Sequence, residues 1–424
     1  MIGLFSEKTK FSSEQEQMLQ KLAIKESGPG SILLDFNGLL GFIKERSLPL
    51  SSTHQLPMRA LPEINARMTR PLQHGLRRPQ QKSYPHINGL YLLIRASGLT
   101  FVGGTSKQPF LFVDREVLQI WNRLNPTEQY FSLLETWLLR GSPEIIGETG
   151  RRFSSIPENF KDWMYFFKSI PEKGLQIADD KDAGESLRHT PGLYNFGLLE
   201  LFGLISVQYG LPVEGKASNI ELIRRTFPGD ALLALLLTEC SEDLRHILEP
   251  EYRRKVPFGV LQPILRPYFP KWKNNLSIPE WVFREGVHIF KVSLGRVWFR
   301  IAMPADRALD ALASAILDAV DFSHDHLYRF SYENRFGTMD KIDHPEMRSQ
   351  PWTETERSWA SDVLVGDLPL RLGQTMTYLY DFGDKWEFDV ALEQVDQEMV
   401  VEKPVLLEIH GEPPEQYPRW GQEE

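Results

Sequence analysis

The sequence contains a single cysteine among its 424 residues. One cysteine cannot form an internal disulfide, and it cannot build a cysteine-based zinc cluster, so both are excluded. Cys240 lies in the apolar run ALLALLLTEC, where burial as a small hydrophobic residue is expected and a reactive thiol is the alternative.

The sequence also lacks a long hydrophobic run. No apolar stretch approaches the roughly 18 to 20 residues that span a bilayer. The start, MIGLFSEKTKFSSEQEQ, has no positively charged segment followed by an apolar one, so no secretory signal is expected. We therefore expect a cytoplasmic protein with no membrane partner.

Conventional catalytic motifs are missing as well. The sequence has no P-loop, no G-x-G-x-x-G, no HExxH and no G-x-S-x-G. The letters Asp381-Phe382-Gly383 match the magnesium-binding motif of protein kinases, but no glycine-rich phosphate loop, VAIK-like strand or HRD sequence accompanies them. Scattered carboxylates such as Glu221 and Glu242 neither support nor exclude a DDE transposase or a serine resolvase. No catalytic class is indicated.

Positive charge is scarce in the last third of the chain. Residues 281–424 hold 14 Lys and Arg against 27 Asp and Glu, a net charge of 14 − 27 = −13. The remaining residues hold 48 − 14 = 34 basic and 57 − 27 = 30 acidic groups, a net charge of +4. Nucleic-acid affinity comes largely from neutralising phosphates, so any such contact is expected in the N-terminal part. An acidic domain is equally consistent with simple solubility.

What the sequence does contain is a helical beginning. Ser13 and Glu16 have the spacing of a capping box, followed by an apolar stripe at helical spacing. A second helix is expected from near Asp35. The stretch from Ser47 to Pro85 carries six prolines, which predicts loop with a short helix at Leu61–Met68.

The segment after Pro85 has the layout of a winged helix. A helix is predicted over His86–Ser97, then strands over Leu99–Val102 and Phe110–Val113 around the turn GGTSKQP. Helices are expected to follow over Val117–Leu124 and Glu128–Leu139.

A second unit of similar layout is predicted further along. It has a helix over Phe196–Leu204, strands over Ile205–Gln208 and Ile220–Arg225, and a helix over Asp230–Leu248. We therefore expect a mostly helical, winged-helix-like region over residues 1–256, holding either one unit or two, at about 1–150 and 151–256. The run Asp179–Glu185 is expected to be a surface loop.

The hydrophobic period changes after a proline-rich segment. Residues 257–280 contain five prolines and predict a linker or an irregular lead-in. Alternating side chains then predict five strands and one helix, with a further short strand at Val363–Pro369 as an option. The strands are His288–Gly295, Val297–Pro304, His326–Glu333, Thr375–Phe382 and Trp386–Val395, and the helix is Ala305–Val320. The order predicts a β-grasp-like α+β domain over 281–424, so the whole chain is expected to be α+β.

One run in this domain has the look of a known family. Tyr380-Asp381-Phe382-Gly383-Asp384-Lys385-Trp386-Glu387, after the strand that contains His326, resembles the core of the plasmid pRiA4b ORF-3-like family. The closing PPEQYP is similar to that family's end, so the resemblance covers about Val287–Pro418. The N-terminal part is similar in pattern alone to the region that precedes this domain in longer members.

The resemblance implies an association with plasmids and insertion elements but brings no reaction. Phe388 stands where many members have histidine, and the cysteine often found shortly before the PPE segment is absent. Both departures weaken a metal or catalytic role for this copy.

The aspartate-rich corner has two interpretations. The structural one treats six residues as a turn that returns the chain onto the sheet, since Asp caps turn amides and Gly adopts positive φ. They are Tyr380, Asp381, Phe382, Gly383, Asp384 and Trp386. The functional one joins the corner to the segment DFSHDH (residues 321–326) in a polar site, with His326, Asp381 and Asp384 as catalytic candidates. His324 and His326 are weak metal candidates, and no metal or other cofactor is expected.

Basic residues in the N-terminal region are candidates for phosphate contacts. They are Arg67, Arg70, Arg77, Arg78 and Lys82, with Arg95 and Lys107 on the winged-helix-like unit. The His86–Ser97 helix itself is too apolar for a recognition helix, so we expect it in the core.

Two hypotheses follow. The first is a non-enzymatic interaction or accessory protein with a protein partner, extended to DNA association through the N-terminal region. The alternative is a metal-assisted enzyme whose site lies at the DFSHDH and YDFGD segments.

Overall fold

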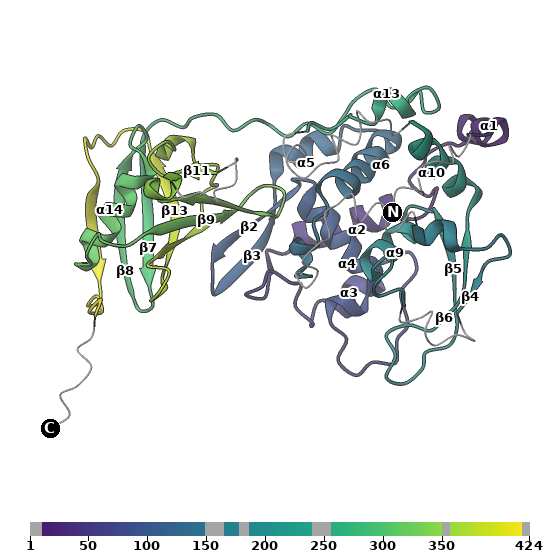
Figure 1. Ribbon diagram of the computed structural model, residues 1–424, viewed down its shortest axis with the longest axis horizontal. Helices are drawn as coiled ribbons and strands as arrows, with labels where there is room; N and C mark the ends of the chain where they lie inside the picture. The colour runs from purple at the N-terminus through teal and green to yellow at the C-terminus, as the bar shows by residue number, and fades with distance from the viewer. Residues whose placement is uncertain (1–10, 149–164, 178–185, 240–255, 350–356, 418–424) are drawn as a thin grey trace. The chain divides into compact units, whose positions relative to one another are not determined.

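The computed structural model describes residues 11–148, 165–177, 186–239, 256–349 and 357–417. Cys240 and part of the predicted helix Asp230–Leu248 lie outside them, as does the whole predicted loop Asp179–Glu185. These described residues form helices and three β-sheets, which confirms the α+β class (Figure 1). It divides into two compact units, residues 1–101 with 111–278 and residues 102–110 with 279–424. The winged-helix and β-grasp assignments stay predictions.

The first unit begins with three helices, α1 (Ser13–Lys21), α2 (Ile32–Glu45) and α3 (Leu61–Ala66). The capping box of α1 is formed by Ser12 and Gln15, one residue earlier than the predicted pair. Helix α2 begins at Ile32, three residues before Asp35. The Asp35 carboxylate accepts hydrogen bonds from the Ser31 hydroxyl and from the backbone N–H of Thr69, both at 2.6 Å. Asp35 therefore anchors the loop after α3 rather than capping the helix.

Helix α4 (Pro85–Ala96) is the core helix of this unit. All of its residues are buried, which confirms the predicted core position. The hairpin of β2 (Thr100–Thr105) and β3 (Gln108–Val113) follows, and β1 (Leu48–Pro49) completes a sheet of order β1-β3-β2. Helices α5 (Arg115–Trp121) and α6 (Pro126–Glu135) come next, and a π-helical turn over Thr136–Arg140 extends α6.

A second helix and hairpin repeat this order. Helix α9 (Leu193–Leu201) precedes β5 (Ile205–Tyr209) and β6 (Ile220–Arg225), which pair with β4 (Leu175–Gln176) in the order β4-β6-β5. Helix α10 (Phe227–Glu239) follows. Helices α4 and α9 cross closely: a Cβ atom on Gly89 would lie 2.7 Å from Leu198, and one on Gly197 would lie 2.5 Å from the Pro85 backbone. The two glycines therefore permit this crossing.

The proline-rich segment packs on the first unit up to Ile278. It contains only a short helix, α13 (Gln262–Leu265), and buries Trp272 among other apolar side chains. The carboxylate of Glu135 accepts hydrogen bonds from the backbone N–H groups of Gly259 and Leu261, at 2.6 and 2.7 Å. Burial raises the pKa of Glu135 to about 7. The irregular backbone is thus anchored by a buried carboxyl group.

The second unit is built on one eight-stranded sheet of order β11-β10-β9-β12-β13-β7-β8-β14 (Figure 1). Every neighbouring pair is antiparallel except β10 and β11. The strands are β7 (Val287–Leu294), β8 (Val297–Pro304), β9 (Tyr328–Glu333), β10 (Met339–Asp343), β11 (Ser358–Trp359), β12 (Thr375–Tyr380), β13 (Trp386–Asp396) and β14 (Val405–His410).

One helix, α14 (Leu309–Val320), packs on this sheet through Leu309, Leu312 and Ile316. It begins four residues later than predicted, because Ala305 and Leu309 donate backbone hydrogen bonds to Gly286 and Val363. It ends at Asp321, whose φ of 58° stops the helix. The core forms from alternate strand residues that face the helix, as the period of two requires.

Three strands of this unit were not predicted, and one optional strand is absent. Strands β10, β11 and β14 lie in stretches for which the sequence predicts no strand. Residues 363–369, where a short strand was an option, instead contain a 3₁₀ turn at Val365–Asp367, and Leu364 makes an isolated bridge to Ala308. In the described residues no helix is long and apolar enough to cross a membrane.

Candidate functional site

The YDFGD corner joins β12 to β13. Asp381 has a φ of 58°, a left-handed conformation that Asp tolerates better than most residues. Its Oδ1 accepts a hydrogen bond from the backbone N–H of Gly383 at 2.8 Å, and its carbonyl accepts one from Lys385 N–H at 2.7 Å. The carboxylate therefore holds the turn in the way the structural interpretation requires.

The aromatic residues of the corner pack inward. Tyr380 is buried, and its hydroxyl donates a hydrogen bond to the Ser323 carbonyl. Trp386 packs edge-on against Phe322, with ring centroids 4.9 Å apart. Both rings fix the corner against the segment that follows α14.

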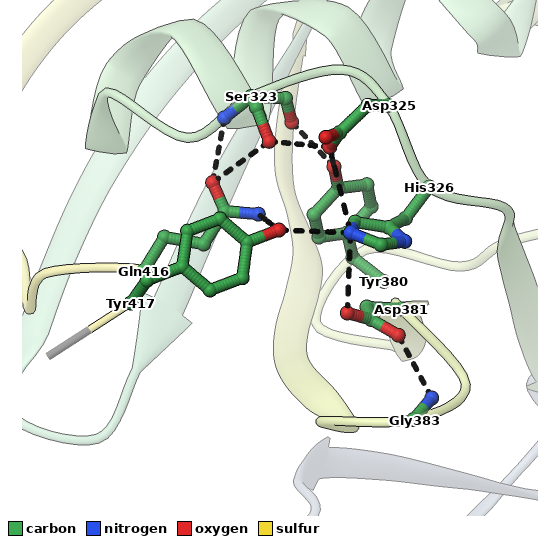
Figure 2. Close-up of polar contacts among 8 residues, drawn as sticks. All are labelled: Ser323, Asp325, His326, Tyr380, Asp381, Gly383, Gln416 and Tyr417. Carbon is green, nitrogen blue, oxygen red and sulfur yellow. Dashed lines mark hydrogen bonds and ion pairs between the residues drawn. The ribbon is translucent and has the colours of Figure 1, made fainter. Parts of the chain in front are cut away.

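The DFSHDH segment and the YDFGD corner converge (Figure 2). His326 Nε2 lies 3.6 Å from Oδ2 of Asp381 and 3.5 Å from Oδ1 of Asp325. Antiparallel pairing of β9 with β12 brings them together, because Tyr328 lies opposite Tyr380 and each strand's polar end falls at the same edge. The sequence does not predict that β9 pairs with β12, and this pairing brings together the two segments that the functional interpretation joins.

The chain's last described residues complete the cluster. The Tyr417 hydroxyl lies 2.8 Å from His326 Nε2, and Gln416 Oε1 accepts a hydrogen bond from Ser323 N–H at 2.7 Å. Gln416 Nε2 also donates to the Tyr417 hydroxyl at 3.0 Å (Figure 2). Sequence reasoning missed both residues as site members, although they belong to the PPEQYP segment that carries the family resemblance.

The other candidates of this region stay outside the cluster. His324 is exposed and faces Asp318, at 3.0 Å, on the end of α14. Asp384 is exposed on the turn. Among the residues that the structure describes, no three His, Cys, Asp or Glu side chains are arranged to hold a metal ion. The arrangement can share protons and hydrogen bonds among His326, Tyr417 and Asp381, and it ties the chain end to the sheet.

The basic candidates fall into three groups, and all of them lie in the first unit except Lys107, which belongs to the second. Arg70, Arg77, Arg78 and Lys82 are exposed, and so is Lys107 in the turn between β2 and β3. Arg67 is paired with Glu45 and Glu63. Arg95 is 1 % exposed, and its Nη1 donates a hydrogen bond to the Tyr91 hydroxyl at 2.7 Å. A guanidinium held in this way is part of the core and is not available to a phosphate.

Two relatives match about a third of the chain each. "Uncharacterized protein y4hQ" of Sinorhizobium fredii (strain NBRC 101917 / NGR234) is 28 % identical over 128 residues, which cover 30 % of this chain and 61 % of that protein. This chain therefore spans less than two thirds of the relative's length. A crystal structure of a protein of unknown function, MM3350 from Methanosarcina mazei Go1, is 25 % identical with a TM-score of 0.27, covering 31 % of this chain and 72 % of that one.

The C-terminal part of the chain also matches a family model. Residues 287–418 match the model of the plasmid pRiA4b ORF-3-like protein family. The match spans the sheet, α14 and the cluster around His326, and it confirms the resemblance that the run Tyr380–Glu387 indicates. Residues 287–418 are therefore similar to the plasmid pRiA4b ORF-3-like family.

Proposed function

We propose that this chain is a non-enzymatic accessory protein of plasmids or other mobile elements, and that its C-terminal unit binds a protein partner along β14. The observation that carries the proposal is the position of β14 at the edge of the eight-stranded sheet. An edge strand presents unpaired backbone N–H and C=O groups, to which an extended segment can add as a further strand.

The side chains of β14 favour the same use. Leu406, Leu407 and Ile409 are 46 %, 40 % and 41 % exposed. Apolar side chains in a row on an edge strand are costly to leave in water unless a partner covers them. The strand therefore offers apolar contacts beside its free backbone.

Charge indicates the kind of segment that fits. Exposed Glu402, Glu412 and Glu415 flank β14, and the unit as a whole is strongly acidic. We expect an extended, basic segment with apolar side chains. A β-bulge between Leu406 and Glu408 interrupts the ladder with β8, and such bulges discourage indiscriminate pairing of edges, which disfavours a second copy of this chain.

The cluster around His326 supports a non-enzymatic role. The Asp381 carboxylate holds the Gly383 amide, the Tyr380 hydroxyl holds the Ser323 carbonyl, and His326 contacts Tyr417. These groups are occupied by contacts that close the fold. A catalytic base must direct its proton-accepting atom at a substrate. The cluster therefore fits a structural contact that ties Gln416 and Tyr417 to the sheet, which we call the C-terminal clasp, better than an active site.

The test begins with capture of a partner by the full-length protein, followed by purification of that partner. Its affinity is then measured for the parent and for the double variant Leu406→Glu/Ile409→Glu. We expect the variant to weaken binding at least tenfold, since it removes two apolar contacts and places charged groups against the apolar side chains of the partner. Met339→Glu, a change at an equally exposed apolar residue on β10, is the matched control and should keep the parent affinity.

The proposal fails if no purified protein binds the parent, or if the β14 variant binds as tightly as the parent. Equal weakening by Met339→Glu would also contradict it, because the effect would then not belong to β14.

A second candidate function, DNA association, rests on a separate observation in the first unit. The loop over residues 70–82 exposes Arg70, Arg77, Arg78 and Lys82. Arg77 pairs with Glu214 at 3.5 Å, but both side chains are almost fully exposed, so the pair is weak and a phosphate can replace it. Clustered cations of this kind suit a sequence-independent phosphate contact.

Fluorescence anisotropy with a labelled duplex tests this candidate at several salt concentrations. Binding by the parent should weaken with salt, and Arg77→Gln/Arg78→Gln/Lys82→Gln should make the slope of log K against log salt shallower by about 2 to 3. Lys21→Gln/Arg115→Gln/Arg123→Gln removes the same charge elsewhere and should bind as the parent does. No binding at low salt by the folded parent, or equal loss in both variants, rules out the loop as a DNA contact.

A further inference from the structure

The first unit has a groove beside α2 with a volume of about 400 Å³. Sites for small molecules measure roughly 300 to 1,000 Å³, so the groove is large enough to hold one. It is lined by Glu26, by Asn37, Leu40, Gly41 and Lys44 of α2, and by residues between positions 118 and 129 of α5, α6 and their connection. We call this space the α2 groove.

Gly41 leaves the space over α2 open. A Cβ atom at this position would meet no atom of another segment within 4 Å, so the packing of the helix does not require glycine here. Glycine inside a helix costs about 1 kcal/mol relative to alanine. The sequence therefore keeps this part of the α2 groove empty at a cost in helix stability.

Two amide side chains of the groove are held by one tryptophan. Trp121 Nε1 donates a hydrogen bond to Asn37 Oδ1 at 3.0 Å, and Gln129 Nε2 donates one to the Trp121 carbonyl at 3.1 Å. The Trp121 ring is buried and packs on Phe36, with ring centroids 5.3 Å apart. These bonds orient both amides and leave the Asn37 Nδ2 donor and the Gln129 Oε1 acceptor without another partner among the described residues.

The groove also has one charged side chain of each sign. Glu26 and Lys44 are exposed, and neither forms an ion pair with a residue that the structure describes. The side chain of Asn122 likewise has no hydrogen bond within the described ranges, so it offers both a donor and an acceptor. Leu40 and Leu124, which are nearly buried, add an apolar wall. A ligand that matches this set carries both charges, amide-like groups and apolar side chains.

We propose that the α2 groove binds a short free peptide with apolar side chains. Lys44 receives its terminal carboxylate and Glu26 its terminal ammonium group. A peptide bond has one donor and one acceptor, which the amides of Asn37, Asn122 and Gln129 can pair with. A ligand with several negative charges fits less well, because the groove has one cation and an opposing carboxylate. This site is independent of the proposed partner strand on β14 and of the basic loop.

Isothermal titration of the full-length protein with the dipeptide leucyl-leucine tests the proposal. We expect saturable binding by the parent, and Lys44→Gln and Glu26→Gln should each weaken it at least threefold. N-acetyl-leucyl-leucine amide, which lacks both charged ends, should bind the parent at least tenfold more weakly than leucyl-leucine does.

A pair of glycine substitutions tests the location of the site. Gly41→Leu fills the groove and should abolish binding, whereas its melting temperature should not fall, because leucine is the better helix former. Gly38→Leu is the matched control. A Cβ atom at Gly38 also meets nothing within 4 Å, but Gly38 does not line the groove, so this variant should keep the parent affinity.

Circular dichroism confirms that each variant is folded, and if Gly41→Leu is not, Lys44→Gln and Glu26→Gln decide. Absence of saturable leucyl-leucine binding by the folded parent overturns the proposal. Parent-like binding by Gly41→Leu, or equal loss in Gly38→Leu, overturns the location in the α2 groove. Equal affinity for the dipeptide and for its acetylated amide overturns the roles of Lys44 and Glu26, as does parent-like binding by both of their variants.

Discussion

At the scale of single residues, the aspartate-rich corner depends on a backbone conformation. Asp381 and Lys385 both have positive φ, at 58° and 57°. Asp381 caps the turn amide as the sequence predicts, but the expected positive φ of Gly is wrong for Gly383, because Asp381 and Lys385 take that conformation instead. The role of Asp384 could not be predicted, because two aspartates three positions apart look alike until the turn decides which one faces inward.

The two aspartates give a matched pair of substitutions. Asp381→Ala should lower the free energy of unfolding by about 1 to 2 kcal/mol, since it removes the hydrogen bond to Gly383 N–H and forces alanine into a left-handed conformation. Asp384→Ala, at an exposed position, should change it by less than about 0.5 kcal/mol. Urea unfolding, with amide exchange of β12 and β13 as a local readout, measures both. Equal effects of the two changes would refute this account of the corner.

His288 makes stability depend on pH. Burial and the nearby Arg284 lower its pKa to about 4 in the folded protein, from near 6.5 when unfolded, so between these values the unfolded chain binds the extra proton. Stability from this group is therefore present above pH 6.5 and is lost as the pH falls toward 4. His288→Gln should reduce the loss of unfolding free energy between pH 7 and pH 5 by about 1 to 2 kcal/mol.

Urea unfolding at the two pH values measures this difference. His324→Gln, at an exposed histidine, is the control and should leave the pH dependence as it is in the parent. A parent and a His288→Gln variant with the same pH dependence would show that His288 does not carry it.

At the scale of elements, the hydrophobic period explains which strands and which helix of the C-terminal unit the sequence predicts. Strands β7, β8, β12 and β13 alternate buried and less buried residues over most of their length, and α14 repeats apolar residues at helical spacing, so their patterns are visible locally. Strand β10 is mostly charged, and β14 carries Leu406 and Leu407 side by side with a bulge. Their strand character comes from pairing with distant strands, which a local pattern does not contain.

The packing of α14 predicts that truncating one buried side chain of this helix lowers the free energy of unfolding strongly. Leu312→Ala should lower the free energy of unfolding by about 2 to 5 kcal/mol, because Leu312 is fully buried in the core and its truncation leaves a cavity. Asp318→Ala, on the exposed face of the same helix, should cost less than about 0.5 kcal/mol. Thermal unfolding compares them, and a mild effect of Leu312→Ala would contradict the helix position described here.

The C-terminal clasp joins two segments that are distant in sequence. Gln416 and Tyr417 lie about ninety residues from Ser323 and His326 in sequence, and no periodicity links the two segments. His326→Ala should release residues 411–417, because it removes the contact with the Tyr417 hydroxyl. Hydrogen exchange of that segment should rise several-fold, whereas His324→Ala should leave it unchanged. Unchanged exchange in His326→Ala would mean that the clasp is held elsewhere.

At the scale of the whole molecule, the charge asymmetry and the change of period near residue 280 predict two different parts. A boundary between the two compact units falls close to that position in the sequence, although residues 102–110 also belong to the second unit. The sequence does not predict that residues 257–278 pack on the first unit. That packing depends on Glu128 and Glu135, whose carboxylates accept backbone hydrogen bonds from a segment more than a hundred residues away.

The proposed functions divide between the same parts: a basic loop in the first unit for DNA, and an acidic unit with an open strand edge for a protein partner. Composition predicts this division of charge, while the open edge follows only from the order of the strands in the sheet.

The central claim is that the C-terminal unit acts by receiving a partner strand on β14. Hydrogen exchange of the full-length protein, alone and saturated with its purified partner, tests it most directly. The account predicts that protection gained on binding is largest at residues 405–410 and absent from the far edge strand β11. Protection that leaves residues 405–410 unchanged, with the partner bound, would contradict it.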